Sequence, residues 1–417
     1  MTPPDGPMHL GGALTPAMPS LDGTTGALDT PNARYLEAAR ILVPRLEAWG
    51  DQIEQERRLP EPLLAALFEA GLFRLLLPRT LDGGEVDPVT FVLVMEEIAK
   101  VDASTAWCLG QAAVCAMIAA SLEPKIARKV FGEDPQAVLA WGPGPDARAI
   151  AVDGGYRVSG RWSFASGCRH ATWLGGYCPI YEPHGAPRRR ADGKPYGRTM
   201  LFPAAEATIL DVWQVSGLRG TGSDSYTVTD LFVPHECAVL RDDPAERRHP
   251  GLLYLFPLGS LFASGFAGVA LALARKTLDA LVALARTKTP RGASGTLRES
   301  SVVQSQVGQA EAKLSSARTF LLATLADTWR AMQRSRTLTL PQRMTIRLAA
   351  TYAIHQSREV VDIAYHAAGA TAIFTHSAFE RRFRDMHTVT QQLQGRQTHF
   401  ETVGQFLLGL EADTTFL

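Results

Sequence analysis

Apolar residues recur with a helical period over the hundred residues that follow position 34. Leu36, Ala39, Leu42 and Leu46 lie three or four positions apart, as on one face of an amphipathic helix. The stretch 102–120 is almost continuously apolar, which indicates a helix that is buried on most of its sides. We therefore predict an all-helical N-terminal region. Its helices are expected to begin near Tyr35, Pro62, Pro88 and Asp102.

Between positions 136 and 240 the pattern changes to short β-branched or alternating stretches that are interrupted by Gly and Pro. Asp153, Gly154 and Gly155 form a hairpin turn signal. Seven short strands at this spacing are typical of a small β-barrel or sandwich. The predicted strands are 137–141, 148–152, 156–162, 172–178, 198–202, 208–213 and 226–233.

The helical period returns after Pro257 and continues to the end of the sequence. The predicted helices are long enough for an antiparallel four-helix bundle and span 261–285, 300–333, 341–369 and 379–410. The fold class is therefore α+β. The predicted parts are a disordered N-terminal arm at 1–33, an N-terminal helical domain at 34–135, a central β domain at 136–242 and the C-terminal four-helix bundle at 250–417.

Charge and composition exclude several classes of function. The 42 Lys and Arg residues balance the 42 Asp and Glu residues, so nucleic acid is not an expected partner. We predict no signal peptide and no membrane contact, and we expect a cytoplasmic protein. The sequence lacks a Walker A phosphate loop, an HExxH zinc motif and a GxSxG nucleophile elbow. The five cysteines have no metal-binding spacing, so no metal site is expected.

Four sequence motifs accompany this order of elements. They are DASTAW at 102–107, GYRVSGRWSFASG at 155–167, GLRGTGS at 217–223 with DLFVP at 230–234, and FRDMH at 383–387. With these motifs the chain resembles the acyl-CoA dehydrogenase superfamily over residues 34–410. The resemblance implies a flavin that is enclosed by the β domain and by the helical bundle of a neighbouring subunit, usually in a homotetramer.

The position of the catalytic base argues against acyl-CoA dehydrogenation. In the straight-chain dehydrogenases a glutamate follows the Arg-Asp motif by eight residues, and here that position is Leu393. Leucine accepts no proton, and loss of a general base typically costs a factor of about 10²–10⁴ in rate. Some branches supply the glutamate from another helix, so Glu311 and Glu359 remain open as bases. They are also explained as surface or ion-pair residues.

The WSFASG and RGTGS stretches resemble the two-component flavin monooxygenases more closely. Hydroxylases of 4-hydroxyphenylacetate, of steroid-derived phenols and of dibenzothiophene belong to this branch. The resemblance implies that a separate NAD(P)H-dependent flavin reductase supplies reduced FMN or FADH2. Dioxygen then gives a C4a-hydroperoxide, which hydroxylates a small aromatic or other apolar substrate.

Two residues are predicted to be catalytic. Ser166 offers a hydroxyl and Gly167 permits close approach of the main chain, so this turn could donate a hydrogen bond at flavin N5. A plain strand-end turn is the alternative. His387 lies where such relatives place a histidine facing flavin and substrate, and its ordinary pKa near ~6.5 suits a base. A structural role for His387 is equally open, and His399 is the second candidate.

The predicted substrate pocket contains Trp107, Cys115 and Leu393. Cys115 stands where several phenol hydroxylases have a second histidine, and a buried cysteine behaves as a small hydrophobe. Phenol hydroxylation is thereby put in doubt, and a nitrogen, sulfur or non-phenolic carbon target becomes more plausible.

Arginine with its planar fork suits phosphate, and Arg286 with Gln304 or Gln306 resembles the pair that reaches the flavin phosphate from a neighbouring subunit. The predicted cofactor-binding residues are Trp141, Gly142, Ser166, Gly167, Arg219, Thr221, Ser223, Arg286 and Gln304. Trp141 is explained equally well as a core aromatic residue. Two other functions remain: an acyl-CoA dehydrogenase with a displaced base, and a non-catalytic scaffold of the same fold.

Overall fold

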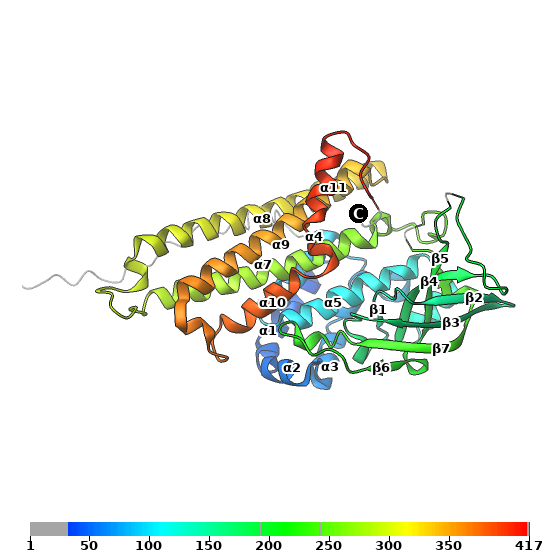
Figure 1. Cartoon of the computed structure of the whole chain (residues 1–417), viewed down its shortest axis with the longest axis horizontal. Helices are drawn as coiled ribbons and strands as arrows, with labels where there is room; N and C mark the ends of the chain where they lie inside the picture. The colour runs from blue at the N-terminus through cyan, green and yellow to red at the C-terminus, as the bar shows by residue number, and fades with distance from the viewer. Residues whose placement is uncertain (1–31, 192, 242, 415–416) are drawn as a thin grey trace, which may run out of the picture.

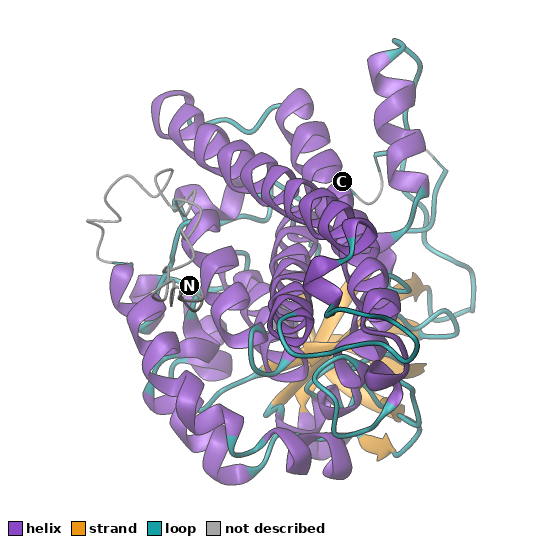
Figure 2. Ribbon diagram, turned by 90° about the vertical axis from the view of Figure 1, so that its left-hand side faces the viewer, coloured by secondary structure: helices purple, strands orange, loops and turns teal. Residues whose placement is uncertain are grey.

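The computed structural model describes residues 32–191, 193–241, 243–414 and 417. The predicted N-terminal arm lies outside these residues, apart from its last two positions. In Figure 1 the long helices α7, α8 and α9 extend to one side and the strands lie together at the other end. Helix α5 runs beside the strands, between them and the long helices. Figure 2 shows from a second direction that helices make up most of the molecule and that the strands gather on one side.

The N-terminal region is helical, as the apolar period predicts. Its helices are α1 Ala33–Glu47, α2 Gly50–Glu56, α3 Glu61–Glu69, α4 Pro88–Ala99, α5 Ala103–Ala116 and α6 Pro124–Phe131. Asp87 caps α4 by accepting hydrogen bonds from the N–H groups of Val89 and Thr90, both at 3.0 Å. Asp102 caps α5 in the same way, through the N–H of Thr105 at 2.6 Å. These caps fix where the two helices that carry the core begin.

Two helices are long and apolar enough, by length and composition, to cross a membrane. They are Ala103–Ala120, which is α5 with the 3-10 turn that follows it, and α7, Leu258–Ala285. Their most apolar windows are 100% and 83% buried inside the fold. Burial on this scale identifies both as core helices of the folded chain.

The strands form one mixed sheet. They are β1 Leu139–Trp141, β2 Arg148–Val152, β3 Gly155–Trp162, β4 Trp173–Tyr181, β5 Gly197–Pro203, β6 Thr208–Leu210, β7 Ser225–Pro234 and β8 Ala238–Val239. The order is β6-β7-β3-β2-β4-β5-β8, with β1 paired to β4. The predicted turn at Asp153 and Gly154 joins β2 to β3, with Val152 opposite Gly155. The short strand β8 has no counterpart among the predicted strands.

The sheet curls around the buried side chain of Trp162. This ring on β3 lies 6.0 Å from Phe202 on β5 and stacks at 5.4 Å on Tyr226 of β7. Strands β3 and β5 are not neighbours in the sheet, so their side chains meet only because the sheet bends over this core. A Cβ on Gly176 of β4 would lie 2.2 Å from the Trp162 ring, so glycine makes room for it.

The C-terminal helices are α7 Leu258–Ala285, α8 Ser301–Ser335, α9 Leu340–Ala368, α10 Glu380–Val389 and α11 Thr398–Leu407. The prediction of one helix over 379–410 is wrong. The chain leaves the helical path after α10 and makes a 3-10 turn at Leu393–Gly395. The Gln392 side chain caps that turn at the Gln394 N–H, at 2.6 Å, and the buried Arg347 donates to Gln394 Oε1 at 2.5 Å. These contacts stabilise the break.

Candidate functional site

The candidate site lies where helix α5, the turn at 163–168 after β3 and the loop at 217–224 before β7 meet. Main-chain hydrogen bonds join the turn to the loop. The N–H of Ala165 donates to the carbonyl of Asp224 at 3.1 Å, and that of Gly167 donates to the carbonyl of Thr221 at 3.0 Å. Gly167 has a φ of 79°, a left-handed conformation that favours glycine. The turn therefore places Ser166 against both α5 and the loop.

A chain of hydrogen-bonded side chains runs through this junction. Nε1 of Trp107 donates to Oγ of Ser166 at 3.0 Å. Ser166 Oγ lies 2.7 Å from Ser223 Oγ, which in turn lies 2.7 Å from Thr221 Oγ1. Thr221 Oγ1 donates to the carbonyl oxygen of Leu218 at 2.8 Å. None of the four side chains is more than 7% exposed, so these hydroxyls depend on one another and not on water.

Trp107 begins a row of side chains along α5. Its ring stacks on Phe266 of α7 with the centroids 3.7 Å apart. One turn further along, Nε2 of Gln111 donates to the carbonyl of Trp141 at 3.2 Å and lies 3.4 Å from Sγ of Cys115. Cys115 is fully buried, and this burial raises the pKa of its thiol well above the ordinary value. The α5 row thus joins the predicted pocket residues Trp107 and Cys115 to the predicted flavin contact Trp141.

The end of β1 approaches the Ser166 turn very closely. A Cβ on Gly142 would lie 1.8 Å from the carbonyl oxygen of Ser163, so only glycine permits this approach. The guanidinium of Arg241 lies 5.1 Å from the centre of the Trp141 ring, in cation–π contact. Trp141 and Gly142 therefore belong to the same site as Ser166.

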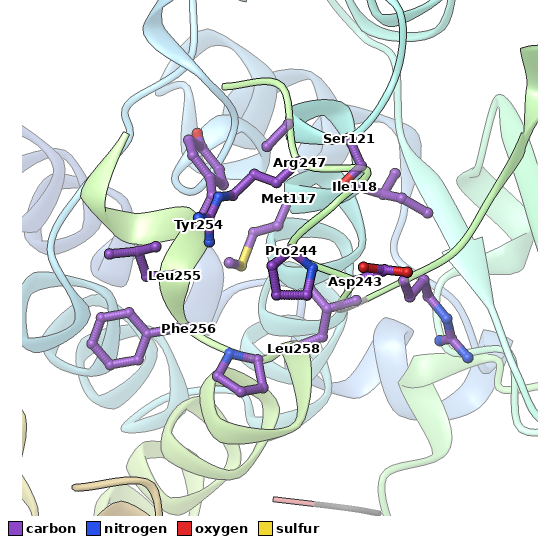
Figure 3. A pocket seen from close by; sticks show the side chains of 13 residues that line it. Met117, Ile118, Ser121, Asp243, Pro244, Arg247, Tyr254, Leu255, Phe256 and Leu258 are labelled. Atoms are coloured by element: carbon purple, nitrogen blue, oxygen red, sulfur yellow. The ribbon is translucent and has the colours of Figure 1, made fainter. Parts of the chain in front are cut away.

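A cavity of about 90 Å³ opens at the far end of the α5 row (Figure 3). Met117 and Ile118, directly after α5, line it together with Tyr254, Leu255 and Phe256 from the segment before α7 and with Leu258, the first residue of α7. Arg241, Asp243 and Arg247 add charged groups of both signs to this lining. Trp107, Cys115 and Leu393 do not line it. The sequence analysis did not find this cavity, because its walls come from segments more than a hundred positions apart.

Helix α10 of the C-terminal bundle holds the loop before β7 in place. Oδ1 of the buried Asp385 on α10 accepts a hydrogen bond from the N–H of Leu218 at 2.6 Å. Leu218 has a φ of 50°, a left-handed conformation that is rare for a branched side chain. Burial raises the pKa of Asp385 to about 7, while the nearby Arg381 opposes the shift. Arg219, the next residue of the loop, turns toward α2, where its Nε lies 3.8 Å from Glu54 Oε1.

The structure does not bring the two predicted histidines to Ser166. Nε2 of His387 lies 2.8 Å from Oδ1 of Asp362 on α9, and its side chain is 39% exposed. Residues two apart on a helix point in nearly opposite directions, so His387 faces away from the loop that Asp385 touches. His399 is buried, and its Nε2 lies 2.9 Å from the carbonyl of Leu393. Leu393 itself is partly buried in the 3-10 turn after α10.

The predicted phosphate ligands lie at the other end of the bundle. Arg286 follows α7 directly and is exposed, twenty residues after Phe266. At 1.5 Å rise per residue this places the two about 30 Å apart along the helix. Gln304 is an exposed residue of α8 and donates to the carbonyl of Arg298 at 2.9 Å. Within one chain, neither residue approaches Ser166.

Sequence reasoning also missed Gln111 and Phe266. Gln111 lies four positions from both Trp107 and Cys115, so helical spacing offered a signal for it. Phe266 is an unremarkable apolar position of a core helix, and only the packing of α7 against α5 identifies it. Among the residues that the structure describes, no group of three or more His, Cys, Asp or Glu side chains is placed to hold a metal ion.

Comparison with known families accounts for both helical regions. Residues 36–130 match the acyl-CoA dehydrogenase N-terminal domain, and residues 264–395 match the acyl-CoA dehydrogenase C-terminal domain. The crystal structure of the HsaA monooxygenase from M. tuberculosis superposes with a TM-score of 0.84 at 25% identity, over 93% of this chain and 100% of that chain. The chain belongs to the acyl-CoA dehydrogenase family, and its predicted fold class is confirmed.

The relatives define the branch. The flavin-dependent monooxygenase oxygenase subunit HsaA of Mycobacterium tuberculosis is 28% identical over 84% of this chain and 89% of its own length. The FADH2-dependent resorcinol hydroxylase oxygenase component of Rhizobium sp. is 28% identical over 91% and 95%. The indole-3-acetate monooxygenase of Pseudomonas putida is 26% identical over 86% and 89%. Within the family this chain is a flavin-dependent monooxygenase of the oxygenase-component type, as its motifs predict.

Proposed function

We propose that this chain binds reduced FMN or FADH2 against Ser166 and uses dioxygen to hydroxylate a small aromatic or other apolar substrate. Bound reduced flavin supplies two electrons, so that one oxygen atom of dioxygen enters the substrate and the other leaves as water. The buried Trp107–Ser166–Ser223–Thr221 chain carries this proposal. It is a fixed polar group in an otherwise apolar junction, beside the close main-chain approach at Gly142.

The residues of the junction divide the work. Ser166 holds the reactive edge of the flavin, and Gly142 lets the chain after β1 lie against the turn that carries Ser166. Trp107, Phe266 and the neutral thiol of Cys115 exclude water from the α5 face. The cavity beyond Met117 admits the substrate, since it lies at the end of the same row. His387 is paired with Asp362 on the side of α10 that faces away from Asp385. It can act as a base only on a substrate group that lies on that side.

The wider setting is part of the same proposal. Several relatives are named oxygenase components, so a separate NAD(P)H-dependent flavin reductase is expected to supply the reduced flavin. Arg286 lies about 30 Å along α7 from Phe266, which favours a homo-oligomer, here proposed as a homotetramer, in which Arg286 and Gln304 reach a neighbour's flavin. We expect the protein to work in the cytoplasm.

The dehydrogenase alternative finds no support in the two glutamates that remained open. Oε2 of Glu311 lies 2.7 Å from an Arg275 nitrogen, and Oε2 of Glu359 lies 2.7 Å from Nζ of Lys313. Both are partly exposed ion-pair residues of the bundle, with side chains 39% and 37% exposed. A carboxylate in this setting is an unsuitable base for the α-proton of a buried acyl-CoA.

The test is a single-turnover reaction of the full-length protein with photoreduced FMN, then FAD, in buffer containing ¹⁸O-labelled dioxygen. A panel of indoles, phenols and aromatic acids is offered as substrate. We expect one ¹⁸O atom in a product. We also expect Ser166→Ala to lower product about tenfold or more and to raise hydrogen peroxide. Flavin that oxidises at the same rate with and without the protein, together with reduction of bound flavin by an acyl-CoA, would point to the dehydrogenase instead.

A further inference from the structure

The hydrogen-bond chain at Ser166 has a fixed direction. Trp107 Nε1 can only donate, and the carbonyl oxygen of Leu218 can only accept. Each hydroxyl between them carries a single hydrogen. Since Thr221 gives its hydrogen to Leu218, Ser223 must donate to Thr221, and Ser166 must therefore donate to Ser223. Reversing the chain would forfeit the bond from Thr221 to Leu218.

This direction determines what Ser166 can offer a ligand. Its hydrogen is held by Ser223, and one lone pair of Oγ is occupied by the Trp107 N–H. One lone pair remains. Ser166 is thus an acceptor toward the site, and the expectation that it donates to flavin N5 does not fit the chain. Reduced flavin carries a hydrogen on N5, whereas oxidised flavin presents a lone pair there. Only reduced flavin can therefore donate a hydrogen bond from N5 to the free lone pair of Ser166 Oγ.

We propose that Thr221 and Ser223 are positioning residues that hold the Ser166 hydroxyl as an acceptor and thereby make the site select reduced over oxidised flavin. The inference rests on the proposed function, since it takes flavin as the ligand. The sequence analysis predicts both as cofactor-binding residues, and in this proposal they act on the flavin only through Ser166. They act by keeping the Ser166 hydrogen turned away from it, inside a junction where no water competes.

The experiment compares two dissociation constants. Full-length protein is titrated without oxygen, first with oxidised and then with dithionite-reduced FMN, and both titrations are repeated with FAD. We expect the wild-type protein to bind the reduced form at least about tenfold more tightly. Thr221→Val removes the acceptor for Ser223, which then donates to Ser166 and turns the Ser166 hydrogen toward the flavin. The ratio of the two constants is expected to fall about tenfold, the effect of one reversed buried hydrogen bond.

Three further variants distinguish an effect of the hydrogen-bond direction from a general structural effect of substitution. Ser223→Ala also frees the Ser166 hydrogen and should lower the ratio, which keeps the test decisive where Thr221→Val fails to fold. Thr221→Ser keeps the hydroxyl and should restore the wild-type ratio. Ser225→Ala is the matched control, because its Oγ donates to Ser163 Oγ at 2.9 Å, at the first position of the same turn but outside the hydrogen-bond chain. It should leave the ratio unchanged.

The outcomes distinguish this inference from the proposed function. An unchanged ratio in Thr221→Val and Ser223→Ala overturns the inference, and so does an equal fall in Ser225→Ala. Wild-type protein that hydroxylates a substrate but binds both redox forms equally removes the inference and leaves the proposed function intact. Wild-type protein that binds neither form of either flavin removes both.

Discussion

At the scale of single residues, the site depends on polar groups that have been taken out of water. Asp385 illustrates this dependence. It is 2% exposed, and its Oδ1 holds the strained Leu218 at the start of the loop that carries Thr221 and Ser223. A buried carboxylate is costly to ionise, and the Leu218 N–H and the nearby Arg381 offset only part of that cost.

Asp385 should therefore make stability depend on pH. Its pKa rises from 3.8 to about 7 in the folded chain, so the folded state holds the proton more tightly than the unfolded state. The stabilisation that the bound proton provides is fully present below pH 3.8 and is lost as the pH rises through about 7. The advantage in unfolding free energy of wild-type protein over Asp385→Asn should fall by up to about 4 kcal/mol across that range.

Chemical denaturation of both proteins at a series of pH values measures this difference. Asp327→Asn is the control, because the Asp327 side chain is 70% exposed on the surface of α8 and its curve should follow that of the wild type. Parallel curves for wild type and Asp385→Asn would show that folding does not raise the pKa of Asp385.

The sequence identified Ser166, Thr221 and Ser223 individually but not their relation. The motifs at 155–167 and 217–223 placed each in a turn, which is a local property of the chain. The bond from Trp107 to Ser166 joins residues 59 positions apart. Such a contact depends on how α5 packs against the sheet, and no local pattern encodes it. The direction of the hydroxyl chain, on which the proposed acceptor role of Ser166 rests, follows only from the complete set of contacts.

At the scale of elements, periodicity predicted most helices and strands because each buries one face. Periodicity also led to the wrong prediction of one long helix over 379–410. Apolar spacing continues across the break, but the Gln392 cap and the hydrogen bond from Arg347 to Gln394 are decided by tertiary contacts. Arg347 is 1% exposed, lies on α9 and also donates to the carbonyl of Gly259 on α7 at 3.3 Å. It thus links two long helices to the turn.

Removing this link should loosen the turn after α10. Arg347→Ala leaves the buried amide oxygen of Gln394 without its donor, which should cost about 2–4 kcal/mol of unfolding free energy. Hydrogen exchange followed by mass spectrometry should show faster exchange at 390–397. Arg330→Ala serves as the control, since that side chain is 65% exposed and should change stability by no more than about 0.5 kcal/mol. Equal exchange in the two variants would mean that the turn is held by other contacts.

At the scale of the whole molecule, one chain holds the two predicted parts of the flavin site far apart. Ser166 and Trp141 lie where the sheet meets α5, whereas Arg286 lies about 30 Å along α7 from Phe266. Exposed aromatic and aliphatic residues accompany each part. Phe164, in the Ser166 turn, is 66% exposed, and Ile373 and Phe374 beyond α9 are 61% and 53% exposed. Apolar surface of this kind is typical of a subunit interface.

Subunit mixing tests whether two chains complete one site. Ser166→Ala should inactivate the site of its own sheet, and Arg286→Glu should weaken the site of its neighbour by placing a negative charge near the flavin phosphate. A mixed pair then contains one site with both defects and one with neither. Reassociating equal amounts of the two variants should restore about a quarter of wild-type product formation, while each variant alone stays low. Sedimentation measured in parallel confirms that the subunits have exchanged. Exchange without recovery of activity would show that Arg286 serves the flavin site of no neighbour.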